Sequence, residues 1–359
     1  MSCFLVTKHP SLKVDEIKKI CYNNNTEIKL NKLKEKLIIM KKNMINQTHI
    51  EGILYAHKLE AKESGKESKN PGTPYVTGTI DIATDDKHTN IVSVHFTYVA
   101  PNYPAKENKP PKPNPNYSIL MNIINGKIKT VMDSSWSDAA RIRVDSAIGL
   151  NEFYSERDGE EVLVSAKRNE GGFIHVITDN NLDADEKHRN TFKVDMVITG
   201  TVEREGDPEK GIADSLIVKG CIFDFRKTLL PVEFVATSPG AINYFLGLGA
   251  SSKEPVFTNI WGNQVSTTVT RTITEESAFG EPSIRETSYS RKDWVITGAR
   301  TETYEWDSED TITVNELKTA MSDRETALAT MKQRSAEWKA NRDNAIKTTA
   351  APAAGDFKF

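Results

Sequence analysis

Apolar and polar residues alternate along much of the first half of the chain, with the period of a half-buried strand. The run Ile91–Phe96 shows this best, and its β-branched and aromatic residues favour a pleated surface. The spacing over Ser118–Met132 is instead compatible with a helix, whose Ile119, Ile123 and Val131 would face the end of a barrel. The pattern predicts strands over 48–60, 74–83, 91–99, 140–148 and 161–168, with 173–178 continuing the last hairpin.

The second half repeats this order of elements. The order that begins at Ile50–Leu54 begins again at Val197–Thr201, and Ile242–Leu246 stands where the first copy has its helix. Gly78 and Gly220 are expected at the same place in the second strand of each copy, where a glycine marks a bulge or a tight bend. Strands of this copy are expected over 192–203, 214–224, 229–236, 256–274 and 283–305, the last two forming a long hairpin that turns at Phe279–Pro282.

Five strands with a helix between the third and the fourth is the element order of the oligonucleotide-binding (OB) fold. The sequence therefore predicts a mainly β protein with two tandem OB-fold-like barrels, a C-terminal helix and a flexible tail. The expected domains are a basic N-terminal extension (1–45), a first barrel (46–190), a second barrel (191–310), a helix (311–347) and a tail (348–359).

Helical periodicity appears near the C-terminus. Thr313 and Glu316 form a capping-box pattern at the helix start. Apolar residues follow on one stripe that Arg324 and Ser335 interrupt: Val314, Leu317, Met321, Leu328, Met331 and Trp338. Two arrangements remain open, since the helix would pack back on the second barrel or pair with another copy of the chain.

Composition narrows the class of protein. Charged residues make up 27% and apolar residues 38%, and no apolar run is long enough to span a membrane. The start lacks the features of a signal peptide, and Cys3, Cys21 and Cys221 form no CxxC pair, so a reducing cytoplasm is expected. The pattern predicts no disulfide framework, metal or cofactor.

Charge is distributed unevenly. Residues 1–43 carry ten Lys and four acidic residues, a net +6, whereas the whole chain has −3, so the remainder carries −9. Two readings of this segment stay open. It is a helical appendage with one apolar face, or it precedes a true start at Met44.

Motifs for catalysis are missing from the sequence, which has no phosphate-binding loop, HExxH or nucleophile elbow. Asp81, Asp85 and Asp86 are interpreted as an acidic turn rather than a cation site.

Cations and aromatic residues are more informative, because a single-strand binder needs charges along the phosphate path and flat side chains for stacking. The candidates in the first unit are Trp136, Arg141, Arg143, Tyr154, Lys167, Arg168 and Phe173. Those in the second unit are Phe225, Arg226, Lys227, Trp261, Arg271, Arg291, Lys292 and Trp294.

The chain ends in Asp356-Phe357-Lys358-Phe359 after an Ala- and Pro-rich tether. Asp356, Phe357 and Phe359 are candidates for docking on a partner, because a terminal Phe carboxylate fits an apolar pocket with a basic rim. With the five-strand-plus-helix order, the glycine-bearing second strand and the phrase Asn169–Phe173, the chain resembles the single-stranded DNA-binding proteins of bacteria and their phages. The tail departs from the strongly acidic tail of that family, since only Asp356 is acidic within the final ten residues.

This resemblance covers residues 46–306 loosely. It implies a non-catalytic, sequence-tolerant protein that coats single-stranded DNA in phage replication or recombination, in the host cytoplasm, with replication proteins as partners of the tail. The alternative is a phage structural or assembly protein built from two β-sandwich modules, which would self-assemble and ignore nucleic acid. A β-rich enzyme acting on carbohydrate or phosphoesters is a third option, for which the sequence shows no constellation of residues.

Overall fold

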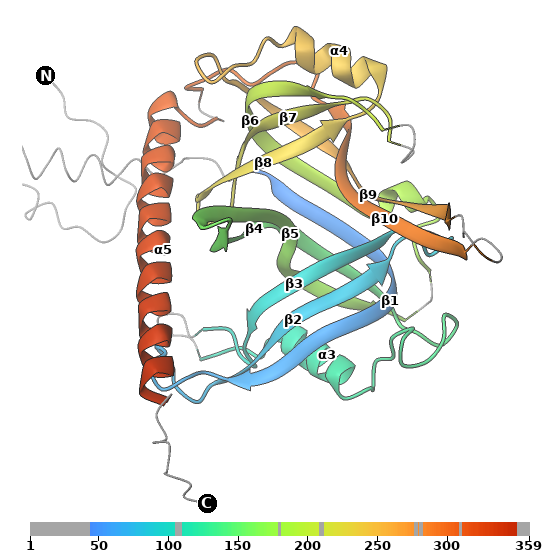
Figure 1. Ribbon diagram of the computed structural model, residues 1–359, viewed down its shortest axis with the longest axis vertical. Helices are drawn as coiled ribbons and strands as arrows, with labels where there is room; N and C mark the ends of the chain where they lie inside the picture. Colours follow the sequence, from blue (N-terminus) through green and yellow to red (C-terminus); the bar gives the residue numbers. More distant parts are fainter. Residues whose placement is uncertain are drawn as a thin grey trace, which may run out of the picture.

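Two five-stranded barrels lie side by side, and one long helix runs along them (Figure 1). The computed structural model describes residues 44–104, 110–178, 181–207, 212–275, 279, 283–308 and 311–349, without the side chains of 267–275, 283–290 and 343–349. The mainly β architecture with a C-terminal helix confirms the predicted fold class.

The first barrel closes through one parallel pairing. Its strands are β1 (Asn46–Glu63), β2 (Pro74–Ala83), β3 (Ile91–Val99), β4 (Arg141–Arg157) and β5 (Glu160–Ile177). β1 pairs with β2 and β4, β2 with β3, and β4 with β5, all antiparallel. β3 pairs with β5 in parallel and closes the ring, the topology of the OB fold. Alternate residues such as Ile80, Val94 and Val144 fill its interior.

The helix of this barrel is shorter than expected. α3 (Pro115–Ile124) begins at Pro115, which suits a first helical turn, behind Asn114, whose side chain accepts a hydrogen bond from the Asn116 N–H. It ends at Ile124 rather than Met132 because Gly126 turns into the left-handed region at a φ of 68° and donates its N–H to the Ile123 carbonyl.

The second barrel repeats the plan. It contains β6 (Asn190–Arg204), β7 (Ser215–Phe223), β8 (Leu229–Ala236), α4 (Pro239–Gly247), β9 (Val256–Glu275) and β10 (Ser283–Ala299). β8 pairs with β10 in parallel at Val235 and Val295, and β6 pairs with β9 to close the ring. Phe192, Phe234 and Trp294 pack together in its core. β10 ends at Ala299 rather than at 305, because regular pairing stops there. The N–H groups of Arg300 and Tyr304 still donate to the Asn259 and Phe257 carbonyls of β9.

The two strand-interior glycines mark different positions in the barrels, which corrects one expectation. Gly78 pairs with Leu59, beyond the part of β1 that pairs with β4. Gly220 instead pairs with Ile198, the last residue of β6 that pairs with β9. Gly78 has a φ of 123° at a register shift of β2, and a Cβ there would collide with the Lys58 carbonyl. Each glycine allows two strands to approach closely, but at a different point of the ring.

Strands and hairpins cross from each barrel to the other. β1 pairs with β6 over Asn46–Ile50, so the two rings share one ten-stranded sheet. β4 runs well beyond its expected end at 148, whereas β5 joins the expected segments 161–168 and 173–178 in one strand. Ile148 of β4 packs in the core of the second barrel. In return, the Asn90 side chain donates to the Gln264 carbonyl and accepts from the Ser266 N–H at 3.0 Å. The barrels are therefore joined by backbone pairing as well as by packing.

The C-terminal helix α5 (Val314–Thr349) packs on β4 and β8, and thus on both barrels (Figure 1). Arg324 donates to the Leu229 carbonyl and pairs with Glu152 at 2.6 Å, while Lys339 pairs with Glu161 at 2.9 Å. The expected apolar stripe is wrong in part. Arg324 and Ser335, taken as interruptions, lie on the packed face, whereas the exposed members of the stripe are Val314, Met321 and Trp338. The short 3₁₀ helix η1 (Glu186–His188) lies in the acidic connection before β6.

Candidate functional site

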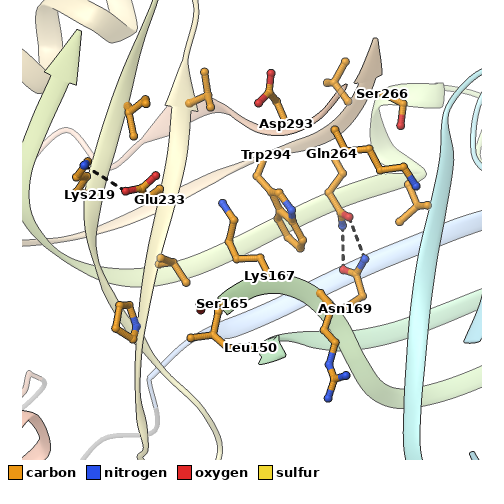
Figure 2. A pocket seen from close by; sticks show the side chains of 18 of the residues that line it. Leu150, Ser165, Lys167, Asn169, Lys219, Glu233, Gln264, Ser266, Asp293 and Trp294 are labelled. Carbon is orange, nitrogen blue, oxygen red and sulfur yellow. Dashed lines mark hydrogen bonds and ion pairs between the residues drawn. The ribbon is translucent and has the colours of Figure 1, made fainter. Parts of the chain in front are cut away.

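A cleft of about 920 Å³ lies between the barrels (Figure 2). The β4–β5 hairpin forms one wall with Leu150, Ser165, Lys167, Arg168 and Asn169. β7 and β8 contribute Lys219, Pro231 and Glu233, and β9 and β10 contribute Gln264, Lys292, Asp293 and Trp294. In an OB fold the second and third strands carry the ligand-binding face, and here β7 and β8 hold that position in the second barrel.

Lys167 is the most perturbed cation of the cleft. Its Nζ lies 4.6 Å from the centroid of the Phe234 ring and 5.6 Å from that of Trp294. Burial lowers the pKa of Lys167 to about 8, although the carboxylates of Glu233 and Asp293 oppose the shift. An ammonium group held over aromatic rings with little water would be stabilised in its charged form by an incoming anion.

The remaining charges make the cleft locally positive. Lys167, Arg168, Arg204, Lys219 and Lys292 line it together with Glu233 and Asp293, so five cations and two acids give +3 in a chain of −3. Lys219 lies 3.4 Å from Glu233, and Arg204 lies 3.7 Å from Asp293. Lys292 is exposed. The local excess of positive charge favours a polyanion despite the acidic total.

Paired amides fix the position of the two walls. The Asn169 side chain donates to Gln264 Oε1 at 2.9 Å, and the Gln264 side chain donates to Asn169 Oδ1 at 2.9 Å (Figure 2). Asn169 also donates to the Ser93 carbonyl at 3.0 Å. This reciprocal contact joins β5 of the first barrel to β9 of the second and therefore sets the width of the cleft at one end.

Four of the predicted nucleic-acid-binding residues meet in this cleft: Lys167, Arg168, Lys292 and Trp294. Trp294 needs a correction as a stacking platform. It is 8% exposed and packs against Phe192 and Phe234, so it supports the cleft from the barrel core. Arg168 pairs with Glu170 at 3.0 Å. Beside the cleft, Arg291 does not line it and instead pairs with Asp293 at 2.9 Å.

Other predicted residues of the first unit lie away from the cleft. Arg141, Arg143 and Phe173 lie on the outer face of β4 and β5, opposite to the face whose residues fill the barrel interior. Trp136 stacks on His88 at a centroid distance of 3.7 Å, so part of its ring is already covered. Tyr154 lies 5.9 Å beneath Lys332 of α5 and faces the helix.

Predicted residues of the second unit are divided in the same way. Phe225, Arg226 and Lys227 form the exposed β7–β8 turn, where Arg226 lies over the Phe225 ring at 5.1 Å. Trp261 is on the outer face of β9, outside the cleft. The Arg271 side chain and the tail residues Asp356, Phe357 and Phe359 are outside the described part of the chain.

Sequence reasoning missed Arg204, Lys219 and Gln264. The local signal for Lys219 was its place as the one charged residue in the apolar run of β7, directly before Gly220. Gln264 carries no such signal, because its partner Asn169 comes from the other barrel.

The described residues offer neither a metal site nor a helix that could span a membrane. No three His, Cys, Asp or Glu side chains there converge as a metal site. None of the described helices has the length and apolar character needed to cross a membrane.

Comparisons with known proteins place the chain in a family. A model of the YorF family matches residues 44–334. No curated protein sequence matches the chain. Among solved structures, the wild-type single-stranded DNA binding protein from Thermus aquaticus is similar at 10% identity and a TM-score of 0.39, over 74% of this chain and 97% of that chain. A deletion mutant of the same protein is similar at 9% identity and a TM-score of 0.37, over 74% of this chain and 98% of that one.

Proposed function

The chain belongs to the YorF family, and we propose that it binds single-stranded DNA, without sequence preference and without catalysis, in the cleft between its two barrels. The observation that carries this proposal is the convergence of five cations from both barrels on one cleft of about 920 Å³. We place the activity in the replication or recombination of phage DNA, as the sequence resemblance implies.

The chemistry of the cleft suits a single strand. A sequence-tolerant binder needs cations along the phosphate path, and Lys167, Lys219 and Lys292 come from three different strands around the cleft. Phosphate contacts supply affinity that does not depend on base sequence. The volume lies within the range of ligand pockets, roughly 300–1,000 Å³, so the cleft has room for a short stretch of nucleotides.

The position of the cleft suits the fold. It lies on β7 and β8, the strands that correspond to the usual ligand face of an OB barrel. The β4–β5 hairpin of the first barrel closes the opposite side, so the strand would contact both barrels at once. Lys167 on this hairpin would face the phosphates, which would stabilise its ammonium form.

Fluorescence anisotropy of a labelled single strand of about 30 bases tests the proposal, with unlabelled duplex as competitor, at about 50 and 200 mM salt. We expect binding that the duplex does not displace and that weakens with salt. The double variant Lys219→Gln/Lys292→Gln should reduce the slope of log K against log salt by about 1.4, since each lost phosphate contact to a single strand removes about 0.7.

The matched control is Lys58→Gln/Lys253→Gln, which removes two exposed lysines that do not line the cleft. We expect the control to keep the wild-type slope. Absence of binding by the wild-type protein at the lower salt would contradict the proposal, and self-assembly of the chain would then be measured by light scattering.

A further inference from the structure

A second groove, of about 370 Å³, lies on the outer face of the second barrel. Trp261 and Tyr304 give it aromatic walls, while Lys193 and Arg300 give it positive charge. No acidic residue is among the described residues that line it. It shares no lining residue with the cleft between the barrels, so it is a separate feature of the surface.

Trp261 lies flat on the sheet in this groove. A Cβ placed on Gly298 would collide with Cε2, Nε1 and Cζ2 of the indole, so the ring covers the backbone of β10 at that residue. Gly298 also follows a register shift between β9 and β10. One face of the indole is therefore against the strand, while the side chain remains 40% exposed. An indole supported on one face and open on the other is a stacking surface for a nucleobase.

Cations flank this indole on both sides. Gln47, Lys193, Trp261 and Gly298 are successive partners across β1, β6, β9 and β10, and directly opposed residues lie on the same face of a sheet. The exposed Lys193 is thus next to the indole in the row. Arg300 comes two residues after Gly298, on the opposite side of the indole from Lys193, and its guanidinium lies 4.5 Å from the centroid of the Tyr304 ring. The spacing places one cation on each side of a stacked base.

Buried hydrogen bonds hold the floor of the groove in place. The buried Asp195 carboxylate accepts from the Asn259 side chain at 2.7 Å, from the Ile45 N–H at 2.7 Å and from the Tyr304 hydroxyl at 3.1 Å. Burial, and next the Asp195 charge, raise the pKa of Tyr304, which keeps this hydroxyl a donor. Three lining residues, Ile45, Asn259 and Tyr304, are fixed through one buried acid.

We propose that this groove is a second binding site for single-stranded DNA, in which a base stacks on Trp261 while the neighbouring phosphates contact Lys193 and Arg300. The proposal rests on the proposed function of the protein, and it extends the bound strand to a face of the second barrel that the cleft does not include. The row reaches β1 at Gln47, so this path too crosses from one barrel to the other.

The same anisotropy assay tests this site with two independent readouts. Trp261→Ala should weaken binding at least fivefold without changing the salt slope, because stacking on an aromatic residue carries no counterion release. Lys193→Gln/Arg300→Gln should lower the slope by about 1.4 instead. Gly298→Ala should weaken binding in the same way as Trp261→Ala, because the new Cβ would displace the indole from the backbone of β10. The control Trp338→Ala removes a tryptophan that is 62% exposed on α5 and should leave both readouts unchanged.

The two sites are distinguished by combining their variants. If both bind, Trp261→Ala added to Lys219→Gln/Lys292→Gln should multiply the losses, since distant sites contribute additively to the free energy. Loss through the cleft variant alone, with wild-type affinity and slope in Trp261→Ala and Lys193→Gln/Arg300→Gln, would overturn the second site and leave the proposed function intact. A wild-type protein that does not bind would overturn both. If Trp261→Ala unfolds the chain, the exposed pair Lys193 and Arg300 still decides the question through the slope.

Discussion

Replacing Lys167 by Met should stabilise the protein near neutral pH and weaken its binding of DNA. Lys167 must carry its proton at pH 7 in a largely buried position, where burial lowers its pKa from 10.5 to about 8. At about 1.4 kcal/mol per pH unit, this lowering of the pKa corresponds to about 3 kcal/mol of free energy. The contacts of the ammonium with Phe234 and Trp294, each cation–π contact contributing about 0.5–2 kcal/mol, offset part of it. We therefore expect Lys167→Met to raise the free energy of unfolding by about 1–3 kcal/mol at pH 7.

The pH dependence gives the sharper test. Between pH 8 and pH 10.5 the unfolded state binds a proton at Lys167 that the folded state has released, so the stability of the wild type rises with pH in this window. The rise from this group is about 1.4 kcal/mol per pH unit at most. Below pH 8 both states are protonated and the contribution is constant. The advantage of Lys167→Met should therefore shrink as the pH rises through this window.

Urea denaturation of both proteins at several pH values from about 7 to about 10 measures this difference, and other titrating groups cancel in the comparison. Anisotropy of the folded proteins at the same pH values should show wild-type affinity for DNA falling above pH 8, where Lys167 loses its charge. The affinity of Lys167→Met should fall less. Parallel stability curves for the two proteins across this pH range would refute the argument, because they would show that Lys167 has an ordinary pKa in the folded state.

Two further predictions concern stability. Arg324→Met should lower the free energy of unfolding by about 3 kcal/mol, because it leaves the mostly buried Glu152 without its partner. The control Arg334→Met, on the exposed side of α5, should change this free energy little. Thermal melting compares the two variants, and equal melting temperatures would contradict the prediction. Gly78→Ala should be strongly destabilising, by more than about 3 kcal/mol, because the new Cβ meets a backbone carbonyl at a positive φ. Gly240→Ala, which meets open space, is the control in the same urea titration, and similar midpoints for the two would show that β2 relaxes around the new side chain.

Local patterns were sufficient for most of the fold because the strands alternate and their ends carry turn residues. The β2 and β3 boundaries match the sequence expectation throughout, since buried positions recur along both strands between half-buried ones. The extension of β4 was missed for a tertiary reason. Phe153 and Tyr154 break the alternation, because Tyr154 faces α5 while Phe153 is exposed on the other side of the hairpin.

The candidate site was harder to predict, because it is formed by residues of both barrels. Lys167 was identified from its own strand, but the rings that surround it, Phe234 and Trp294, lie in the other barrel. Trp261 and Trp294 look alike in sequence. Their side chains differ in position because Gly298 leaves space for the indole of Trp261 on the outer face of the barrel, whereas Trp294 points inward and packs on Phe192. Such distinctions require the strand register, which the sequence pattern does not specify.

The shared core has a consequence for how the chain is made. Ile148 is a residue of β4 and yet is buried among side chains of the second barrel. During synthesis from the N-terminus, β1–β5 leave the ribosome before β6–β10, and until then Ile148 has no apolar surroundings and the β1 edge at Asn46–Ile50 has no β6 partner. A nascent first half is thus an aggregation-prone intermediate that the second half protects as it emerges. The fragment 44–189 should accordingly bind a hydrophobic dye and aggregate at concentrations where the complete chain stays monodisperse, and a well-behaved fragment would show that the first barrel matures alone.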